Sequence, residues 1–412
     1  MEVLVPARMG RRFRWLVASS WTSNIGDGIA VAAGPLLVAS QTHSAFLVAM
    51  AALVQKVPWL VFGLWAGALA DRLDRRKVVM IADTLRSLVV AALCVTIFTG
   101  KVSIGIVLVV MLLYGVAEVF ADTTTSTLLP MLVDKPDLGT GNQRLQAGFL
   151  TCNQLVGPPV GAFLFAAGEA WPFVVQVVCV LLAVLLVSRI AAAHGETELT
   201  AGTADGQRTH VLRDIGGGLR WVWSNAAVRT LALVILAFNV TWAAAWSVLV
   251  LWSRDRLGMS AVGFGLLTTG SGVGGIIGTL LYRRIELRFS MANMMRVCLL
   301  LEVLTHLAFA LTTAGWLAIA IMVEFGAYSF VWGTVSNTVR QRAVPRAFQG
   351  RVSSVYMVCV FGGIIAGQAL GGVIAQRWGV VAPFWFAFAG AGITLALVWR
   401  QLSSIAHAES DD

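Results

Sequence analysis

Long apolar stretches alternate with short polar breaks along the whole of this 412-residue chain. A helix crosses the hydrocarbon core of a bilayer in about 20 residues, and the apolar stretches are of this length. The pattern predicts twelve membrane-spanning helices, over residues 15–39, 46–69, 78–99, 103–129, 145–167, 171–190, 229–251, 261–281, 293–312, 316–337, 352–375 and 380–399. We therefore expect an all-α membrane protein.

The longest polar break, residues 191–228, divides the predicted helices into two groups of six. Its first part is polar and glycine-rich, whereas Val211 to Trp223 has the pattern of a short amphipathic helix at a membrane surface. We expect an N-terminal six-helix bundle over residues 1–190, a cytoplasmic central loop over 191–228, and a C-terminal six-helix bundle with a short cytoplasmic tail over 229–412.

Basic residues gather in every second break. Nearly all Lys and Arg residues outside the predicted helices lie before the first helix or in these breaks, and the opposite breaks hold only Lys101, Arg254, Arg256 and Arg377. Loops with excess Lys and Arg stay in the cytoplasm. An even number of helices then places both termini in the cytoplasm.

The composition agrees with a membrane protein and excludes several other classes. Hydrophobic residues make up 58% of the chain and charged residues 12%, about half the charged fraction of a soluble protein. The sequence has no phosphate loop of an ATP-driven pump, no metal-ligand spacing among its cysteines, and no basic run interleaved with aromatic residues. We expect no enzyme activity, no cofactor, no metal and no nucleic-acid partner.

The two halves of the chain share positions at one offset. A shift of 211 residues places Pro172-Phe173 on Pro383-Phe384 and four glycines on four others. The glycine matches are Gly63, Gly67, Gly115 and Gly161 with Gly274, Gly278, Gly326 and Gly372. Parallel six-helix repeats are typical of transporters in which two bundles alternate access to a midplane site.

The break between the second and third predicted helices carries a specific motif. It reads Gly67-Ala68-Leu69-Ala70-Asp71-Arg72-Leu73-Asp74-Arg75-Arg76-Lys77. This segment resembles the signature of the major facilitator superfamily, with Asp74 where that pattern usually has glycine. Further motifs resemble its drug:proton antiporter branch, which includes enterobactin-exporter-like and macrolide-efflux-like proteins: Leu129-Pro130, Leu138, Asn142, Gly157-Pro158-Pro159-Val160-Gly161, Gly218-Leu219-Arg220-Trp221, Arg340-Gln341-Arg342, Pro345 and Gly350-Arg351-Val352.

The resemblance covers nearly the whole chain and implies a monomeric secondary transporter in the cytoplasmic membrane of a bacterium. It implies export of a hydrophobic or amphipathic drug, antibiotic or siderophore-like metabolite in exchange for protons, by alternating access. The partners are then the small-molecule substrate, protons and the lipid bilayer. Two alternatives stay open: a nutrient or lipid permease or flippase of the same fold, and a membrane sensor that has lost transport.

Two ionisable residues lie near the middle of predicted helices. Asp27 is about twelve residues into the first helix and Lys56 about ten into the second, so both lie near the midplane. An unpaired charge there costs at least about 2.5–3.5 kcal/mol, and we expect the two side chains to pair or one of them to be neutral. Asp27 then either exchanges protons, with Lys56 tuning it, or forms a fixed structural ion pair. Asn24, in the same helix as Asp27, is a further candidate.

Two other pairs of ionisable residues have helical spacing. Glu118 and Asp122 are four residues apart on one face of the fourth helix, which the resemblance places beside the transport cavity. Glu118 is the deeper of the two and is a candidate proton carrier. Glu302 and His306 have the same spacing in the ninth helix, which lies outside the cavity in this fold, so we expect a local structural pair there.

Aromatic residues mark the seventh helix. Trp242 and Trp246 are four residues apart, and Asn239 lies about one turn earlier on a similar face. An aromatic cavity with a few carboxylates suits bulky cationic or amphipathic compounds. The alternative is that these tryptophans pack against other helices or lie at the membrane surface.

The charged motif and the glycines before it are candidates for conformational gating. Gly63 and Gly67 lie on one helix face and permit close approach of a neighbouring helix. Asp71 is expected to pair with Arg75 or Arg76 and to latch the two halves in one state, the alternative being a solvated charge cluster.

A proline-containing motif interrupts the fifth predicted helix. Gly157, Pro158 and Gly161 lie within this helix, and proline removes a backbone donor and bends a helix. We therefore predict a kink there. The resemblance associates this motif with export, and the alternative is a purely structural bend.

Overall fold

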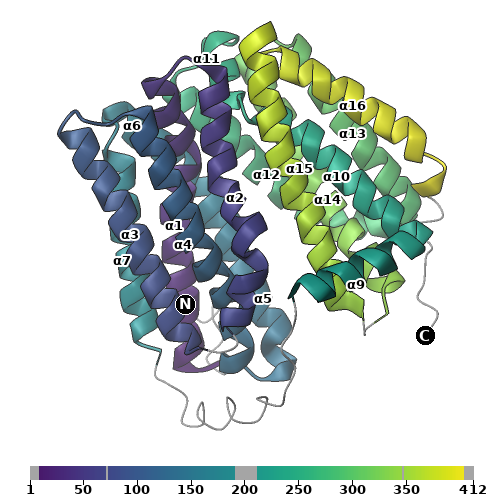
Figure 1. Cartoon of the computed structure of the whole chain (residues 1–412), viewed down its shortest axis with the longest axis horizontal. Helices are drawn as coiled ribbons and strands as arrows, with labels where there is room; N and C mark the ends of the chain where they lie inside the picture. The colour runs from purple at the N-terminus through teal and green to yellow at the C-terminus, as the bar shows by residue number, and fades with distance from the viewer. Residues whose placement is uncertain (1–8, 71–72, 191–210, 346–347, 403–412) are drawn as a thin grey trace. The chain divides into compact units, whose positions relative to one another are not determined.

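The computed structural model describes residues 9–70, 73–190, 211–345 and 348–402, and every regular element of these residues is helical (Figure 1). Ten segments are long and apolar enough to cross a membrane. Two further helices, at the first and last predicted positions, complete the set of twelve. The all-α membrane fold predicted from the hydropathy pattern is therefore confirmed.

The chain divides into two compact units. The first comprises Met1–Gly34 and Val61–Val211, and the second comprises Pro35–Leu60 and Leu212–Asp412. The unit boundaries thus fall within the first two helices, which are α1 (Gly10–Gln41) and α2 (Ala45–Ala70).

The segment Pro35–Leu60 groups with the second unit, whereas the predicted division lies in the central loop. Polar contacts within the second unit explain this grouping. Ser44 Oγ donates a 3.0 Å hydrogen bond to Gln376 Oε1, and Arg254 Nη1 donates one of 3.0 Å to the carbonyl oxygen of Ala39.

The other helices follow the predicted spans within a few residues. Those of the first unit are α3 (Arg75–Phe98), α4 (Ile104–Leu132), α5 (Leu138–Gly148), α6 (Gly157–Ala167) and α7 (Trp171–Ser188). Those of the second unit are α9 (Val211–Ser224), α10 (Ala226–Trp246), α11 (Leu249–Asp255), α12 (Ala261–Glu286), α13 (Met291–Leu311), α14 (Gly315–Ala343), α15 (Gln349–Trp378) and α16 (Ala382–Val398). The amphipathic α9 lies across the direction of α15 (Figure 1), with Trp221 stacked on Phe348 at 5.5 Å between ring centres.

The contacts of Asp74 give a structural reason for its presence where the superfamily signature usually has glycine. Its side chain accepts hydrogen bonds from the backbone N–H groups of Arg76 (3.0 Å) and Lys77 (3.3 Å) at the start of α3. An aspartate in this position caps the free N–H groups of a helix and complements its dipole, which glycine does only weakly. The substitution therefore fixes where α3 begins.

The fifth predicted span changes its helical geometry halfway. α5 passes into a π-helical segment, Phe149–Val156, and then into α6, whose first turn holds Pro158 and Pro159. Proline is accommodated in a first turn because its missing N–H would have no partner there. The irregularity predicted at Gly157 and Pro158 takes the form of this π-helical segment, a geometry found frequently at functional sites.

Gly157 and Gly161 bring α6 directly against the backbone of α1. A Cβ atom at Gly157 would lie 2.5 Å from Cα of Gly28, and one at Gly161 would lie 2.1 Å from the carbonyl oxygen of Ile29. No side chain fits at such distances. Close packing of two membrane helices through small residues is the expected reason.

The same contact recurs in the second unit between α10 and α15. A Cβ atom at Gly363 would lie 2.8 Å from Cβ of Asn239, and one at Gly367 would lie 2.3 Å from the carbonyl oxygen of Val240. The two α10 positions follow their α1 counterparts by the predicted 211 residues, whereas the two α15 glycines follow their α6 counterparts by 206. The repeat is therefore present in the packing of the two units.

This packing corrects one predicted equivalence. Gly161 corresponds to Gly367 and not to Gly372, because the second half has five fewer residues between these helices. A Cβ atom at Gly372 would instead lie 2.7 Å from Cβ of Ala49 in α2.

The close helix approach predicted at Gly63 is absent from the described residues of the first unit. A Cβ atom at Gly63 would meet no heavy atom within 4 Å, so this glycine has room for a side chain. At Gly274, its match in the second half, a Cβ atom would lie 1.9 Å from the carbonyl oxygen of Val323. The small-residue contact predicted at Gly63 is thus found at its match in the second half, between α12 and α14, as far as the described residues show.

Apolar side chains lie on the outside of the units and polar ones lie within. Phe163 and Leu397 are 67% and 72% exposed, whereas Arg86, Gln176 and His306 are buried. Ionisable residues of membrane helices face the protein interior and mark functional positions. These buried polar groups are therefore candidates for a functional site.

Candidate functional site

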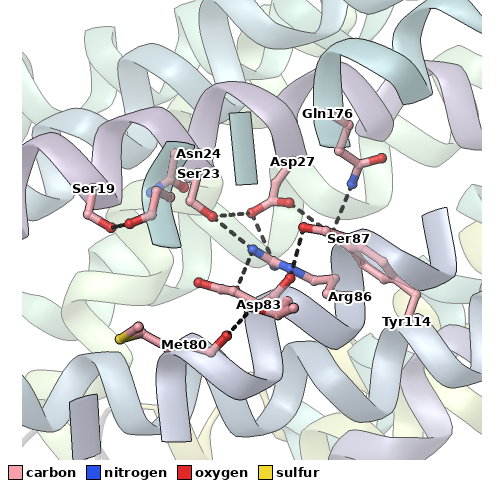
Figure 2. A network of polar contacts seen from close by, with 12 residues as sticks. Ser19, Ser23, Asn24, Asp27, Met80, Asp83, Arg86, Ser87, Tyr114 and Gln176 are labelled. Carbon is pink, nitrogen blue, oxygen red and sulfur yellow. Dashed lines mark hydrogen bonds and ion pairs between the residues drawn. The ribbon is translucent and has the colours of Figure 1, made fainter. Parts of the chain in front are cut away.

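Asp27 lies at the centre of a polar network in the first unit (Figure 2). Its Oδ1 atom accepts a 2.8 Å hydrogen bond from the hydroxyl of Tyr114, and its Oδ2 atom accepts one of 3.3 Å from Ser23. The same Oδ2 lies 3.4 Å from Nη1 of Arg86. Gln176 Nε2 donates to the Tyr114 hydroxyl at 3.2 Å, so four helices (α1, α3, α4 and α7) meet around this carboxylate.

Arg86 is shared between two carboxylates. Its Nη2 atom lies 3.0 Å from Oδ1 of Asp83, one turn earlier on α3, and donates a 2.8 Å hydrogen bond to Ser23. Its guanidinium carbon lies 5.5 Å from the centre of the Tyr114 ring. A guanidinium presents several donors in one plane and can contact several groups at once. One side chain therefore links α1, α3 and α4, with Asp27 as one of its two anionic partners.

The sequence of α1 places the network on one face of that helix. Ser19, Ser23 and Asp27 follow one another at four-residue intervals, which is one helix face. Ser19 Oγ donates a 3.0 Å hydrogen bond to the carbonyl oxygen of Ala183 in α7. The polar stripe of α1 is therefore turned into the first unit and not toward the outside.

Asp27 differs from Arg86 in its access to solvent. The Asp27 side chain is 19% exposed and the Arg86 side chain is 2% exposed. The aspartate is therefore partly exposed, while the arginine is enclosed between its partners. Asp27 is accordingly the more exposed member of the ion pair.

Two carboxyl groups of α4 extend the network. Tyr114, Glu118 and Asp122 are spaced four residues apart on one face of α4. Asp122 interacts electrostatically with Glu118, Arg86 and Asp27. The Oε2 atom of Glu118 is buried and has no hydrogen-bond partner among the described residues, whereas Asp122 is exposed.

Two carboxyl groups, those of Asp27 and Asp83, therefore contact the Arg86 guanidinium, and two more, those of Glu118 and Asp122, follow Tyr114 on the same face of α4. Negative charges crowded in a medium of low dielectric repel one another and are poorly solvated. Binding of protons or of a cationic ligand relieves this excess charge. The residues that the structure describes contain no cluster of three His, Cys, Asp or Glu side chains able to hold a metal ion.

Two residues of the predicted site make no contact with Asp27 among those found for the described residues. Lys56 belongs to the second unit, where it has no ion pair among the described residues, and its pairing with Asp27 stays a prediction. Asn24 hydrogen-bonds its own helix, with Nδ2 donating to the carbonyl oxygen of Ser20 at 2.7 Å. Asn24 is thus beside Asp27 in the sequence without sharing its hydrogen bonds.

The predicted aromatic residues form a cluster in the second unit. The rings of Trp242 and Trp246 are 5.7 Å apart, and Trp246 also contacts Phe325 at 4.7 Å between ring centres. The indole Nε1 of Trp242 is buried without a hydrogen-bond partner among the described residues. Asn239 donates to the carbonyl oxygen of Ile235 at 2.7 Å, so its amide is already engaged within α10.

Glu302 and His306 form the local pair that their spacing predicted. His306 Nε2 lies 3.1 Å from Glu302 Oε1, and both residues are buried in α13. The hydroxyl of Tyr328, on α14, donates a 2.7 Å hydrogen bond to the other carboxylate oxygen.

The charged motif ties the start of α3 to neighbouring helices of the first unit. Arg75 Nη1 donates a 3.3 Å hydrogen bond to the carbonyl oxygen of Thr127 in α4, and Arg76 hydrogen-bonds the carbonyl oxygen of Ile190 after α7. Asp71, the predicted partner of these arginines, lies outside the described residues. Gly67 lies in the last turn of α2.

Sequence reasoning missed four members of the Asp27 network, which are Ser23, Arg86, Tyr114 and Gln176. Tyr114 has a usable signal, because it precedes Glu118 and Asp122 by one and two four-residue steps on the same helix face. Arg86 pairs with Asp83 three positions earlier on its own helix, but its contact with Asp27 joins residues that are 59 positions apart in the sequence. Gln176 has no such signal, since a single polar residue in an apolar helix does not reveal its partner.

Comparison with known proteins identifies close likenesses over the full length. A family model described as transmembrane secretion effector matches residues 3–412. The multidrug efflux pump Tap of Mycolicibacterium fortuitum is 30% identical, with 90% of each chain covered. The enterobactin exporter EntS of Shigella boydii serotype 4 is 25% identical, covering 95% of this chain and 92% of its own.

Solved structures show the same fold at lower identity. The crystal structure of a D-xylose–proton symporter matches with a TM-score of 0.72 and 16% identity, covering 97% of this chain and 99% of that one. Likeness at this identity shows the fold and leaves the substrate open.

Proposed function

Because this chain belongs to the transmembrane secretion effectors of the major facilitator superfamily, we propose that it exports amphipathic or hydrophobic small molecules in exchange for protons. The chain is a transporter and not an enzyme. The observation that carries the proposal is the network in which Asp27, accessible to solvent, shares Arg86 with Asp83. The proton coupling and the substrate class are the parts that require testing.

The network offers a simple way to couple proton binding to movement. When Asp27 takes up a proton, its side chain loses the charge that attracts Arg86, while Asp83 keeps Arg86 paired. The contact between α1 and α3 weakens and the contact within α3 remains. Loss of a proton restores the ion pair and draws α1 back toward α3. Proton binding thereby favours one arrangement of these helices over another.

Side chains within each unit, taken separately, support a bulky cationic or amphipathic substrate. The carboxyl groups of Glu118 and Asp122 attract cations, and the Trp242–Trp246–Phe325 cluster offers aromatic surfaces for stacking and cation–π contacts. Two relatives carry related names, a multidrug efflux pump and an enterobactin exporter. The proposed substrate class therefore includes drugs, antibiotics and siderophore-like metabolites.

We place the transporter in the cytoplasmic membrane of a bacterium, with both termini in the cytoplasm, as a monomer. The distribution of Lys and Arg between the breaks supports this orientation. The relatives named above are bacterial.

The proposal is tested by transport into inverted membrane vesicles. Vesicles that hold the wild-type chain should accumulate a fluorescent cationic dye when a proton gradient with an acidic interior is imposed. Accumulation should stop when the gradient is collapsed. Asp27→Asn removes the charge at almost constant volume, so it should lower gradient-driven accumulation to the level of vesicles without the protein. Asp134→Asn, the same change at an exposed position after α4, is the matched control and should transport as the wild type does.

The outcomes separate the alternatives. Undiminished gradient-driven accumulation by Asp27→Asn rules out the assigned role of Asp27. Accumulation that is independent of any ion gradient points to a facilitated permease or flippase. No accumulation of any compound by a folded wild-type chain points to a membrane sensor.

A further inference from the structure

The second unit holds a buried ionisable cluster outside the network described above. Glu302 Oε1 faces His306 Nε2 at 3.1 Å, and Glu302 Oε2 accepts the 2.7 Å hydrogen bond of Tyr328. The Tyr328 hydroxyl also lies 3.1 Å from Oγ1 of Thr305. Glu302 is 8% exposed and His306 is 0% exposed. Both oxygens of the carboxylate are therefore satisfied inside the unit.

No Lys or Arg forms an ion pair with Glu302 among the described residues. The other titratable groups near the cluster are Cys298 on α13 and Tyr328 and Glu324 on α14, none of which is cationic. α16, which packs against α13, contains no ionisable residue, and the single charged residue of α10 is Arg229, at the opposite end from Trp246. With His306 neutral and Glu302 ionised, the cluster carries one uncompensated negative charge.

The second ring nitrogen of His306 is the place where a proton can be added. A neutral imidazole that donates from Nε2 to Glu302 leaves Nδ1 as a bare acceptor. This Nδ1 atom is buried and has no hydrogen-bond partner among the described residues. A proton bound at Nδ1 turns the ring into an imidazolium, keeps the Nε2–H bond to Glu302, and brings the net charge of the cluster to zero.

We propose that the Glu302–His306 pair is a proton-binding site of the second unit, which takes up one proton at Nδ1 of His306. The inference goes beyond the proposed function, because it assigns a second proton site in the unit that does not hold Asp27. In each unit a charged residue next to the proton site then contacts a tyrosine of the following helix. In the first unit, where Asp27 of α1 binds the proton, Arg86 on α3 contacts Tyr114 on α4; in the second, Glu302 on α13 contacts Tyr328 on α14.

An aromatic contact connects this site to the predicted substrate residues. The Trp246 ring meets His306 edge to face, with 5.9 Å between ring centres and 87° between the planes. Trp246 is also in contact with Trp242. A change of charge on His306 therefore alters the electrostatic environment of the Trp246 ring. The fluorescence of Trp246 reports this change, because a protonated histidine quenches a neighbouring indole.

The test reads the protonation of the ring itself. The full chain, labelled with ¹⁵N in its five histidines, is placed in lipid nanodiscs, and ¹⁵N spectra are recorded from about pH 5 to about pH 9, which brackets the ordinary titration range of histidine. The His306 signals are those lost in His306→Gln and kept in His43→Gln, the same change at an exposed position. We expect a ring protonated at Nε2 at high pH and a doubly protonated ring at low pH.

Glu302→Gln supplies the second arm of the test. Loss of the carboxylate removes the charge that stabilises the imidazolium, so the ratio of charged to neutral ring at a given pH should fall about tenfold or more. Tyr328→Phe keeps the carboxylate and should change this ratio less, which serves as a milder variant if Glu302→Gln fails to fold. In parallel, the pH-dependent part of the fluorescence should disappear in Trp246→Phe.

A His306 ring that stays neutral over the whole pH range overturns the inference, and so does an identical titration in the wild type and a folded Glu302→Gln. The measurement requires no transport. An intact titration in a chain that moves no dye would reject the proposed function and leave this site standing, whereas active export with a ring that never titrates would do the reverse.

Discussion

The hydroxyl of Tyr114 donates a 2.8 Å hydrogen bond to Oδ1 of Asp27. A hydrogen bond to a charged group is worth about 1.5–3 kcal/mol, and the phenol also faces Arg86. We expect Tyr114→Phe to fold and to lower the rate of proton-driven export about tenfold or more, because one oxygen of the Asp27 carboxylate loses its donor. Initial rates of dye efflux in proteoliposomes over a series of imposed pH gradients measure this effect.

Tyr282→Phe is the matched control for that variant. The Tyr282 hydroxyl contacts Glu286 at the exposed end of α12, so its loss should leave efflux unchanged. Equal losses in the two variants would show a general effect of removing a tyrosine hydroxyl, and full activity of Tyr114→Phe would remove Tyr114 from the coupling network.

Arg75→Ala should slow turnover more than it weakens substrate binding. Arg75 hydrogen-bonds the carbonyl oxygen of Thr127 and so connects the start of α3 with α4. Neither residue belongs to the Asp27 network. Loss of this contact should slow the rearrangement of the helices. It should leave the proposed substrate-binding side chains in place. Equilibrium dye binding and turnover number, measured on the same preparation, separate the two effects.

Lys77→Ala provides the comparison, since Lys77 is exposed and its ion pair with Asp74 spans 3.8 Å, a type of contact worth little in water. It should keep both binding and turnover. A large loss of affinity in Arg75→Ala at an unchanged turnover number would contradict the gating role.

Gly161→Ala should lower thermal stability and the yield of folded protein. Its Cβ would lie 2.1 Å from the carbonyl oxygen of Ile29, so α6 and α1 would have to separate, and overpacking of this kind costs about 1–3 kcal/mol. Gly63→Ala is the matched change at a helix position with open space around it and should be neutral or stabilising, because alanine favours a helix by up to about 1 kcal/mol over glycine. Melting temperatures in one detergent compare the two, and equal values would refute the packing argument.

The fold could be predicted from the sequence because length and hydropathy determine which segments cross a membrane. All twelve predicted spans and the amphipathic segment at Val211 appear within a few residues of their expected bounds. The break between α10 and α11, after Trp246, could not be predicted, because an apolar sequence that is continuous through a turn carries no hydropathy signal.

The candidate site was predictable only in its members that have unusual chemistry. Asp27, Glu118 and Asp122 stand out because a carboxylate is rare in an apolar helix. The contact of Asp27 with Arg86 within the first unit was not predicted, and the pairing with Lys56, which the sequence offered by depth, stays a prediction. Depth in the membrane follows from position along a helix, but the direction in which a side chain points around the helix axis depends on tertiary packing.

Glu118→Gln should narrow the range of substrates, with the largest loss for cationic compounds. Glu118 lies one helical turn from both Tyr114 and Asp122, and its Oε2 atom is buried without a hydrogen-bond partner among the described residues. A carboxylate held in this way is available to a cation, and the attraction is strong because the surroundings have a low dielectric constant. The amide keeps the size of the side chain and removes the charge. Neutral hydrophobic compounds gain nothing from that charge and should be exported at nearly the wild-type rate.

The measurement is a panel of cationic and neutral compounds of similar size, compared for efflux by the wild type, Glu118→Gln and the exposed control Asp134→Asn. We expect the rates for cationic compounds to fall about tenfold in Glu118→Gln, which corresponds to about 1.4 kcal/mol of lost interaction, and to stay unchanged in the control. Equal losses for cationic and neutral compounds would assign Glu118 to proton transfer, because every substrate depends on the proton gradient. Unchanged rates for the whole panel would show that Glu118 contributes to neither step and that Asp122, the exposed carboxylate of α4, attracts the cation instead.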